Sequence, residues 1–492
     1  PLKGGRFVKA NDGISLDIYE GETFGLVGES GCGKSTLGRT ILQLYHQTYG
    51  RTMYYGRSLD DLAPKYVIDT VKNLKSRRAK LHELEQKRDK LEAEYAKLSE
   101  TEQYAKHTEL DTARKLAEDA LLDITKIVGG FLVVDDLDPV IAAYSKDYGI
   151  ARRISALEEK RQALQVDVDD AQYAKKTAEE AGKSEKSGQL EKAQEKLKQC
   201  DDQIAALRQQ LDAGRQEIEA LRQPYASDPE FQKYEAYRDD GIDLARLEYN
   251  EMRRLRSDMQ LIFQDPYSSL NPRMSVGQII SEGMQAHNMI KKKDARMQQL
   301  VLNIMDECGL APYFLHRFPH QFSGGQRQRI GIARALATNP KFVVCDEAVS
   351  ALDVSIQAQI INLLLDLKEH QNLTYMFITH DLSVVKYISD RVGVMYLGNM
   401  VELAEADEIF HHPIHPYTEA LLNAIPTTDT VGAKELSILE GDIPSPVNPP
   451  KGCKFHTRCK YCTEICTQVV PAWEEVRPNH FVACHHKLEV KE

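Results

Sequence analysis

The residues with the clearest chemical use lie between Gly28 and Thr36. Their pattern is G-x-x-x-x-G-K-[ST], in which glycines let backbone N–H groups turn toward a phosphate. An apolar segment, residues 23–27, precedes the loop, and a helical pattern follows it. This order directs a helix dipole at the same phosphates. Lys34 is expected to reach the β- and γ-phosphates and Ser35 to ligate Mg²⁺. The expected nucleotide-binding residues are Gly28, Glu29, Ser30, Gly31, Cys32, Gly33, Lys34, Ser35 and Thr36.

Two adjacent acids form a second group with chemical use. The apolar run 342–345 ends in Asp346 and Glu347. A buried parallel strand that ends here places the Asp346 carboxylate beside the phosphate loop, where it can hold Mg²⁺. Glu347 can polarise an attacking water. Phosphoryl transfer needs mainly positioning and charge neutralisation, so a base, a metal and a γ-phosphate sensor suffice for ATP hydrolysis.

Further motifs follow residue 260 in a fixed order. They are residues 261–266 around Gln264, residues 322–326, the run ending in Glu347, residues 350–353 and residues 378–381. A capped helix or a buried strand explains some of them singly but not the whole order. Together they resemble the Q-loop, signature, Walker B, D-loop and H-switch of ABC-type ATPases. The resemblance implies catalytic roles for Glu347, His380 and Gln264, with Gln264 also near Mg²⁺. It adds to the nucleotide site Asp353 and, for ATP held by an opposite subunit, Ser323, Gly324, Gly325 and Gln326.

Longer stretches are similar to the ATPases of oligopeptide/dipeptide ABC importers, closer to the F-type than to the D-type subunit. These stretches are FQDPYSSLNPRM (263–274), SALDVSIQAQ (350–359), MYLGNMVE (395–402) and HPYTEALL (415–422). The similarity covers residues 1–63 and 241–492. It implies ATP-driven peptide import at the cytoplasmic face of a bacterial membrane, with a peripheral subunit. The implied partners are a second ATPase subunit of the D-type, two transmembrane permease subunits and an extracytoplasmic peptide-binding protein.

Composition agrees with this interpretation. The chain of 492 residues has a formal net charge of −11, which argues against binding nucleic acid through phosphate contacts. It has no apolar run of about 18 residues and no signal-peptide pattern. By the resemblance Phe7 is a candidate for stacking on adenine, and a core position is the alternative for this residue.

Residues 64–240 change character and become rich in Lys, Glu, Ala, Gln and Leu. Apolar spacings alternate between three and four, which is typical of a coiled-coil seam. We expect two long helices, 68–126 and 151–222, folded as one antiparallel hairpin, with a break at 182–188. The bend between them contains apolar runs at 131–134 and 140–143, either as a self-packed cap or as a docking surface. The later seam is Ala193, Leu197, Cys200, Ile204, Leu207, Leu211, Gly214, Ile218 and Leu221.

The insertion raises an alternative function. Chromosome-maintenance ATPases also split their ATPase with a long coiled coil, and a soluble mechanical ATPase of that kind is the second hypothesis. In those families the coil follows the Q-loop glutamine. Here it precedes Gln264, and the bend carries no C-x-x-C pair. The importer interpretation is therefore favoured.

Five of the nine cysteines lie near the C-terminus, with the spacing C-x5-C-x2-C-x3-C-x17-C. A cytosolic ATPase is not expected to hold disulfides, so metal binding is favoured. Four thiolates suit an iron–sulfur cluster or zinc, and nearby histidines keep zinc open. Unmetallated thiols are the third possibility. In many members of the resembling family the positions that match Cys453, Cys459, Cys466 and Cys484 bind a 4Fe–4S cluster, and Cys462 is additional.

The expected fold class is α/β: an ABC-type nucleotide-binding domain interrupted by a long antiparallel α-helical coiled-coil hairpin, with a small Cys-rich C-terminal domain. The expected boundaries place the first part of the ATPase at residues 1–63 and the hairpin at 64–240. The second part of the ATPase follows at 241–430, and the Cys-rich domain at 431–492.

Overall fold

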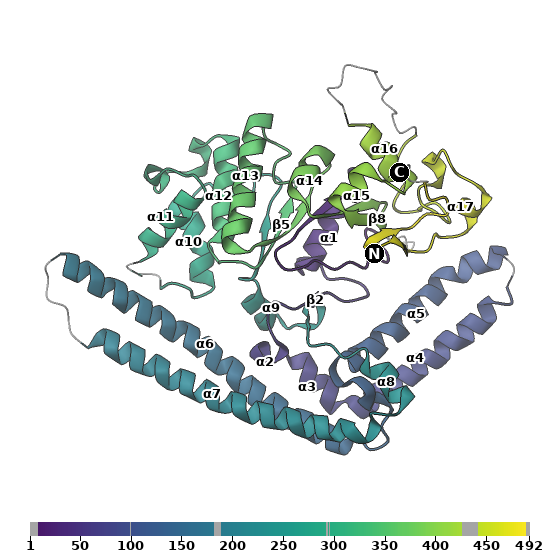
Figure 1. Cartoon of the computed structure of the whole chain (residues 1–492), viewed down its shortest axis with the longest axis horizontal. Helices are drawn as coiled ribbons and strands as arrows, with labels where there is room; N and C mark the ends of the chain where they lie inside the picture. Colours follow the sequence, from purple (N-terminus) through teal and green to yellow (C-terminus); the bar gives the residue numbers. More distant parts are fainter. Residues whose placement is uncertain are drawn as a thin grey trace. The chain divides into compact units, whose positions relative to one another are not determined.

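The structure is a computed structural model that describes residues 8–98, 100–181, 188–291, 294, 296–425 and 441–488. The chain forms two compact units (Figure 1). The sheet unit contains residues 1–45, 256–287 and 297–492. The helical unit contains residues 46–255 and 288–296.

The sheet unit is built on an eight-stranded sheet with the order β4-β5-β6-β1-β7-β8-β10-β9. Strands β4, β5, β6, β1 and β7 are parallel, whereas β8, β10 and β9 continue the sheet in antiparallel pairs. The strands are β1 Thr23–Val27, β4 Met259–Ile262, β5 Phe342–Asp346, β6 Thr374–Ile378, β7 Arg391–Tyr396, β8 Asn399–Glu405, β9 Glu474–Arg477 and β10 His480–Val482.

The parallel strands are nearly continuous apolar runs, as expected for strands with helices on both faces. All five residues of β1 and of β6 are buried. Helix α1 lies directly on β5 and β6: a Cβ added to Gly38 would stand 2.9 Å from both Ile378 and Val344. The helices of this unit are α1 Lys34–Ile41, α10 Val276–Ala286, α11 Met297–Glu307, α12 Gly324–Leu336, α13 Val354–Gln371, α14 Leu382–Ile388, α15 Ala406–His411, α16 Pro416–Asn423 and α17 Glu464–Gln468.

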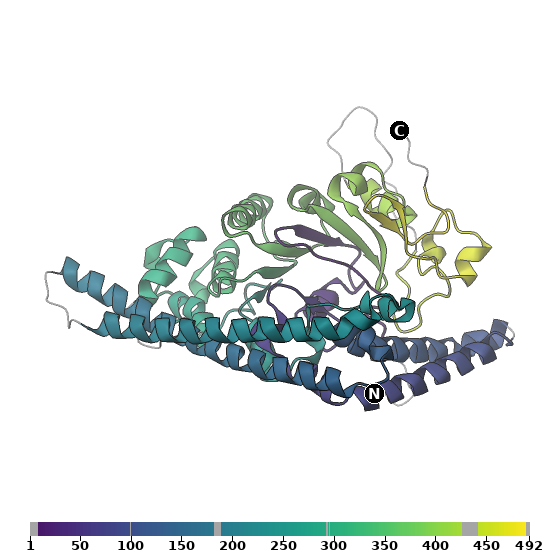
Figure 2. The same cartoon turned by 60° about the horizontal axis from the view of Figure 1, so that its bottom comes forward.

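The helical unit consists of two antiparallel helix pairs. Helix α4 packs on α5, and α6 packs on α7; each pair runs side by side in Figures 1 and 2. The short strands β2 and β3 pair antiparallel at the ends of the insertion. The elements are β2 Met53–Tyr54, α2 Leu59–Leu62, α3 Lys65–Lys72, α4 Leu74–Tyr95, α5 Glu100–Val128, α6 Asp138–Glu180, α7 Gln189–Arg222, α8 Pro229–Glu235, β3 Ile242–Asp243 and α9 Tyr249–Leu255.

The expectation of a single hairpin is wrong. Residues 68–126 do not form one helix that pairs with 151–222. Helices α4 and α5 pack against each other, and α7 packs against α6. Six of the nine predicted seam residues of α7, from Cys200 to Ile218, are buried as expected. Four of them, Cys200, Ile204, Leu207 and Leu211, belong to one core cluster with Ala151 and Ile154 of α6. The heptad pattern identified the buried face but not the helix that covers it.

The bend differs from expectation as well. Helix α6 begins at Asp138, with Pro139 in its first turn, and therefore includes residues 138–150, which were expected to lie in the bend. Gly149 lies inside α6. Phe131 and Val140 are 0% and 2% exposed and belong to the core of this unit. The self-packed interpretation of the bend is therefore confirmed for these residues. The predicted break at 182–188 falls mostly outside the described residues.

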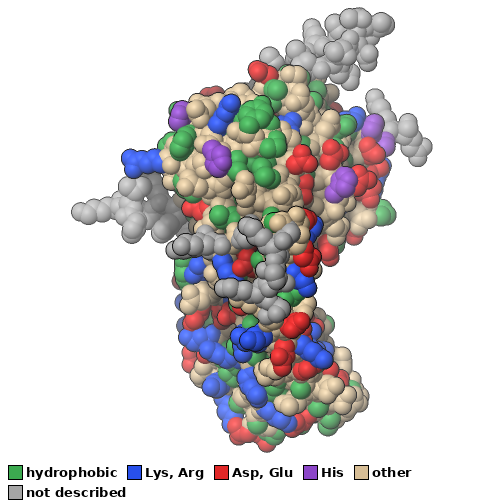
Figure 3. Space-filling view, turned by 90° about the vertical axis from the view of Figure 1, so that its left-hand side faces the viewer, with side chains coloured by type: hydrophobic (Ala, Val, Ile, Leu, Met, Phe, Trp, Pro, Cys, Tyr) green, Lys and Arg blue, Asp and Glu red, His purple; other side chains and the backbone are tan. Residues whose placement is uncertain are grey.

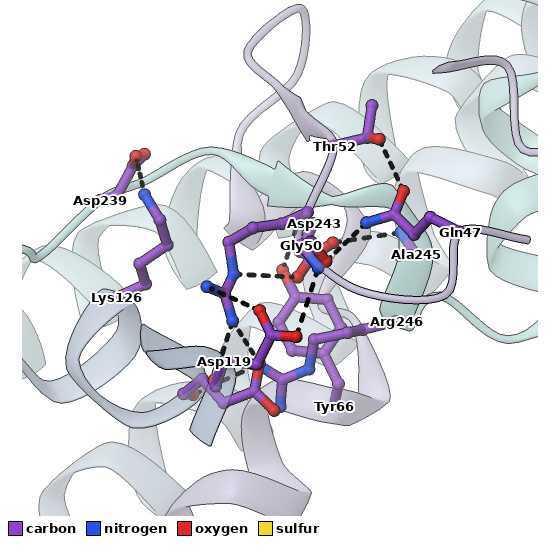
Figure 4. A network of polar contacts seen from close by, with 12 residues as sticks. Gln47, Gly50, Thr52, Tyr66, Asp119, Lys126, Asp239, Asp243, Ala245 and Arg246 are labelled. Atoms are coloured by element: carbon purple, nitrogen blue, oxygen red, sulfur yellow. Dashed lines mark hydrogen bonds and ion pairs between the residues drawn. The ribbon is translucent and has the colours of Figure 1, made fainter. Parts of the chain in front are cut away.

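Charged side chains complete the helical unit. Arg51 contacts Asp123 at 2.9 Å and Asp243 at 3.7 Å. Lys126 contacts Asp239 at 2.6 Å (Figure 4). These pairs link the strand regions of β2 and β3 to helix α5. On the surface, basic and acidic side chains are interspersed (Figure 3). Ion pairs between exposed side chains contribute little to stability.

Candidate functional site

The site residues that the sequence predicts follow neighbouring strands of the sheet. Strands β4, β5, β6 and β1 are neighbours and parallel, so their carboxyl ends share one edge. The segments that leave this edge contain Gln264 after β4, Glu347 after β5, His380 after β6 and the loop from Gly28 after β1. A single topological feature thus explains why residues hundreds of positions apart in sequence meet.

The phosphate loop requires its glycines. Gly28, Gly31 and Gly33 have φ values of 148°, 80° and 106°, which L side chains rarely adopt. A Cβ on Gly28 would stand 2.2 Å from the carbonyl oxygen of Met395. Lys34 is 4% exposed, and its Nζ donates to the carbonyl oxygens of Gly28 at 2.7 Å and of Glu29 at 3.0 Å. The lysine therefore already lies inside the loop that it is expected to serve.

A hydroxyl and a carboxylate meet at the start of α1. Ser35 Oγ donates to Asp346 Oδ1 at 2.5 Å, and Asp346 is 1% exposed. Arg39 Nη2 lies 3.2 Å from Asp346 Oδ2 and balances the buried charge. A hydroxyl oxygen beside a carboxylate is the donor set that Mg²⁺ prefers, so these residues fit the ion. Arg39 was missed, although it lies four residues after Ser35 and hence on the same helix face.

Glu347 is the common contact of the predicted catalytic residues. Gln264 Nε2 donates to Glu347 Oε2 at 2.8 Å, and His380 Nδ1 lies 3.5 Å from the same oxygen. Glu347 has a φ of 48°, a left-handed conformation that is uncommon for a residue with a side chain. Its N–H donates to the carbonyl of Ile378 at 2.9 Å, which continues the pairing of β5 with β6. The backbone therefore turns between Asp346 and Glu347, and the two acids have different partners.

The signature residues lie on another element. Ser323 caps helix α12: its Oγ accepts from the Gln326 N–H, and Gln326 Oε1 accepts from the Ser323 N–H at 3.1 Å. Ser323 and Gly324 are exposed, and Gly325 follows in the first turn. Asp353 stands at the start of α13 and is exposed. Thr36 lies in α1, and Phe7 lies outside the described residues.

One contact of the phosphate loop could not be predicted from the sequence. Arg458, between two of the C-terminal cysteines, donates to the Glu29 carboxylate at 2.7 and 3.0 Å. The two residues are 429 positions apart. No local spacing rule links such positions, so only the folded chain reveals the pair.

The four predicted cysteine ligands are close enough to influence one another. Burial raises the pKa of the Cys484 thiol to about 12, and the thiols of Cys453, Cys459 and Cys466 add to the rise. Burial likewise raises the pKa of Cys453 to about 11. Cys462 is exposed. The thiols of Cys453 and Cys484 therefore resist deprotonation. A cation bound beside them would favour the thiolate form instead.

A single-ion site is not formed by these residues. In the part of the chain that the structure describes, no group of three His, Cys, Asp or Glu is arranged to hold a metal ion. Two histidines near the cysteines, which are candidate zinc ligands by residue type, contact other groups. His480 is buried against Glu402 at 2.8 Å, and His486 lies 2.6 Å from the Thr463 hydroxyl. The zinc alternative therefore has no support here, and the expected iron–sulfur cluster is not shown by the described residues.

Comparison with known families agrees with the geometry. The ABC transporter profile matches residues 11–233 and 231–350, more than half of the chain. The chain belongs to the ABC transporter family of ATPases, whose nucleotide-binding fold the sheet unit displays. A second profile, the C-terminal region of oligopeptide/dipeptide transporters, matches residues 401–466. Within the family the chain is thus one of the oligopeptide transport ATP-binding proteins.

Curated relatives support the same placement. The oligopeptide transport ATP-binding protein AppF of Bacillus subtilis is 52% identical over 250 residues, which cover 50% of this chain and 75% of that protein. OppF of Salmonella typhimurium is 52% identical over 247 residues, 50% of this chain and 73% of that protein. A putative peptide import ATP-binding protein of Brucella ovis is 53% identical over 245 residues, 50% of this chain and 77% of that protein. These relatives do not favour the chromosome-maintenance alternative. Among the described helices, none is both long and apolar enough to cross a membrane.

Proposed function

We propose that this chain is the ATP-hydrolysing subunit of a bacterial peptide importer. The observation that carries the chemistry is the contact of Gln264 and His380 with one oxygen of Glu347, beside the buried pair of Ser35 and Asp346. The family membership carries the transport role. ATP binding closes a pair of such ATPases, and hydrolysis opens it.

Each residue has a distinct task in this proposal. Lys34 and the loop N–H groups bind the β- and γ-phosphates. Ser35 and Asp346 hold Mg²⁺, which neutralises charge on the phosphate oxygens when bound. Gln264 and His380 fix Glu347 through Oε2, so we assign Oε1 to the attacking water. The signature residues at the start of α12 contact ATP held by the opposite subunit.

Replacing Glu347 by Gln tests the chemistry. The amide cannot accept a proton from water, so ATP turnover should fall by about 100-fold or more while ATP still binds. Turnover is measured in the assembled complex with the partner's catalytic acid also replaced, so that only this chain's site contributes. Glu369→Gln is the matched control, since it makes the same charge change on the exposed end of α13. Turnover near wild type for Glu347→Gln would remove this residue from the catalytic role.

The assembly follows from the importer role. We assign as partners a D-type ATPase subunit, two transmembrane permease subunits near Gln264 and an extracytoplasmic peptide-binding protein. The subunit would lie at the cytoplasmic face of the membrane as a peripheral protein. Copurification of this chain with membranes in high salt tests the assignment, because a soluble mechanical ATPase would remain in the supernatant.

We also retain a 4Fe–4S cluster as a proposal for the C-terminal cysteines. In such a cluster each thiolate binds a different iron, so the sulfurs stand farther apart than around one zinc ion. The thiols of Cys453, Cys459 and Cys466 lie near enough to Cys484 to raise its pKa, and this proximity supports these four residues as the set. Anaerobically purified protein should contain iron and sulfide, and Cys484→Ser should lose both, whereas Cys462→Ser should retain them. Stoichiometric zinc without iron would overturn the proposal.

A further inference from the structure

Glu29, inside the phosphate loop, is fixed from three sides within the sheet unit. Its carboxylate accepts two hydrogen bonds from Arg458, at 2.7 and 3.0 Å. Its backbone N–H donates to the Tyr417 hydroxyl at 2.9 Å, and its carbonyl accepts from Lys34 Nζ at 3.0 Å. The loop residue that lies next to Gly28 therefore has little freedom to move.

Arg458 is held in place by the cysteine segment. It ends a short 3₁₀ turn, His456–Arg458, between Cys453 and Cys459. Phe455, just before that turn, is 2% exposed and lies 5.2 Å, between ring centroids, from Tyr417. The side chain of Arg458 is 4% exposed, so the pair with Glu29 is shielded from water on the arginine side.

A second set of contacts connects the segment from Cys453 to Cys459 with the phosphate loop. Lys454 Nζ donates to the carbonyl of Leu397 at 2.9 Å. The next residue, Gly398, donates its N–H to the carbonyl of Cys32 at 2.9 Å. Residues 454 and 458 thus reach the phosphate loop by two routes, one through the β7–β8 turn and one through Glu29.

The pair has a direct consequence for nucleotide binding. An unpaired carboxylate at position 29 would lie beside the phosphates and repel them. A guanidinium that donates two parallel hydrogen bonds removes that charge and also fixes the orientation of the side chain. A loop that is ordered before ATP arrives loses less conformational entropy on binding.

We propose that Arg458 is a positioning residue for the phosphate loop, which acts through Glu29 and makes ATP affinity depend on the folding of the segment from Cys453 to Cys459. The inference rests on the proposed ATP site and adds to it a dependence on the C-terminal segment. Arg458 itself does not contact the reacting atoms.

The test uses the full chain and the fluorescent nucleotide methylanthraniloyl-ATP. Arg458→Gln should weaken nucleotide affinity about tenfold. In the assembled complex the KM for ATP should rise similarly, while kcat at saturating ATP stays close to wild type. Arg458→Lys should recover part of the affinity because it retains the charge but not the two-bond geometry. Lys460→Ala is the matched control: it removes the neighbouring ion pair with Glu419, at 2.9 Å, and should leave the affinity unchanged.

A double-mutant cycle separates positioning from a general structural role. If Arg458 acts through Glu29, Arg458→Gln has no further effect on affinity in a Glu29→Gln background. An equal loss in both backgrounds, or no loss in either, would overturn the inference. Failure of the unaltered chain to bind the nucleotide would instead overturn the proposed function, and this inference with it. Insensitivity of measurable binding to Arg458→Gln overturns this inference alone.

Discussion

The sheet unit and the helical unit differ in how their side chains are used. In the sheet unit, strand ends bring a few polar residues to one edge, and glycines with positive φ shape the loop between them. In the helical unit, long apolar faces pack along most of their length, and few positions require a special residue. Chemistry is therefore concentrated in the first unit, and stability of the second is distributed over many contacts.

This difference decides how each unit responds to change. A single substitution at the sheet edge removes a function and leaves the fold, because the strands do not depend on that side chain. A single substitution in the helical core leaves the ATP site and destabilises the helices, because a cavity cannot be refilled locally.

The largest effect on nucleotide binding is expected from Lys34→Ala. This change removes a nearly buried cation from the phosphate loop, so nucleotide affinity should fall by about 100-fold. Hydrogen exchange of the helical unit should not change. Lys386→Ala, on the exposed face of α14, is the control for loss of a lysine charge. Faster exchange in α5 or α7 of the Lys34 variant would show that the two units are not energetically separate.

Phe131→Ala should have the converse effect. Phe131 is 0% exposed, with Tyr144 and Phe231 at edge-to-face distances of 6.3 and 5.7 Å and Arg222 over its ring. Its truncation should lower the free energy of unfolding of the helical unit by about 3–5 kcal/mol. Leu116→Ala, at a position that is 39% exposed, should cost much less.

Urea unfolding followed by hydrogen exchange in residues 129–144 gives the measurement for both variants. Nucleotide affinity should remain at the wild-type value in each. A fall in affinity that parallels the loss of stability would contradict the separation between the units.

The ATP site was predictable because its residues have fixed places on strand ends. Asp346 and Glu347 follow a buried strand, and Gln264 and His380 follow its neighbours. Because these strands are neighbours in the sheet, the four side chains are expected at the same edge. Their roles stay predictions until the variants are measured. The contact between Arg458 and Glu29 was beyond the sequence, since neither residue belongs to a spacing rule that involves the other.

The helical unit was predictable only in part, for a physical reason. A heptad pattern specifies an apolar face, but any helix with a matching face can cover it. Between α4 and α5 the sequence itself indicates a new helix, because Ser99 and Glu102 have the S-x-x-E spacing typical of a helix start. Long patterns with few breaks therefore conceal the positions where the chain reverses.

Asp147→Asn should have a moderate and pH-dependent effect. Burial raises the pKa of Asp147 from 3.8 to about 6. The positive charge of Lys146 lowers this pKa, and the negative charge of Glu217 raises it. The folded state then binds a proton more tightly than the unfolded state, so stability falls as pH rises from 3.8 through 6. The Asn variant should lose this dependence and gain about 1–3 kcal/mol above pH 6. Hydrogen exchange of the α6 and α7 contact around Gly214 at pH 5 and pH 7.5 measures it, and an unchanged pH profile would contradict the assignment.

The smallest effect on the ATP site is expected from removing the helical pairs altogether. Strands β2 and β3 pair with Tyr54 opposite Ile242, so residues 56–240 can be replaced by an Asn-Gly turn that closes a hairpin. Nucleotide affinity should stay within about twofold of wild type, because the residues that we assign to ATP binding all lie in the sheet unit. A milder variant replaces only residues 166–193 by a Gly/Ser link, beyond the Arg161–Asp201 pair at 2.6 Å, and retains the packed core of the helical unit. Insolubility of the full deletion together with normal binding by the milder variant would show that the base of the insertion is part of the fold. Loss of affinity in the milder variant would show that the outer parts of α6 and α7 act on the ATP site, and the separation drawn here between the two units would fail.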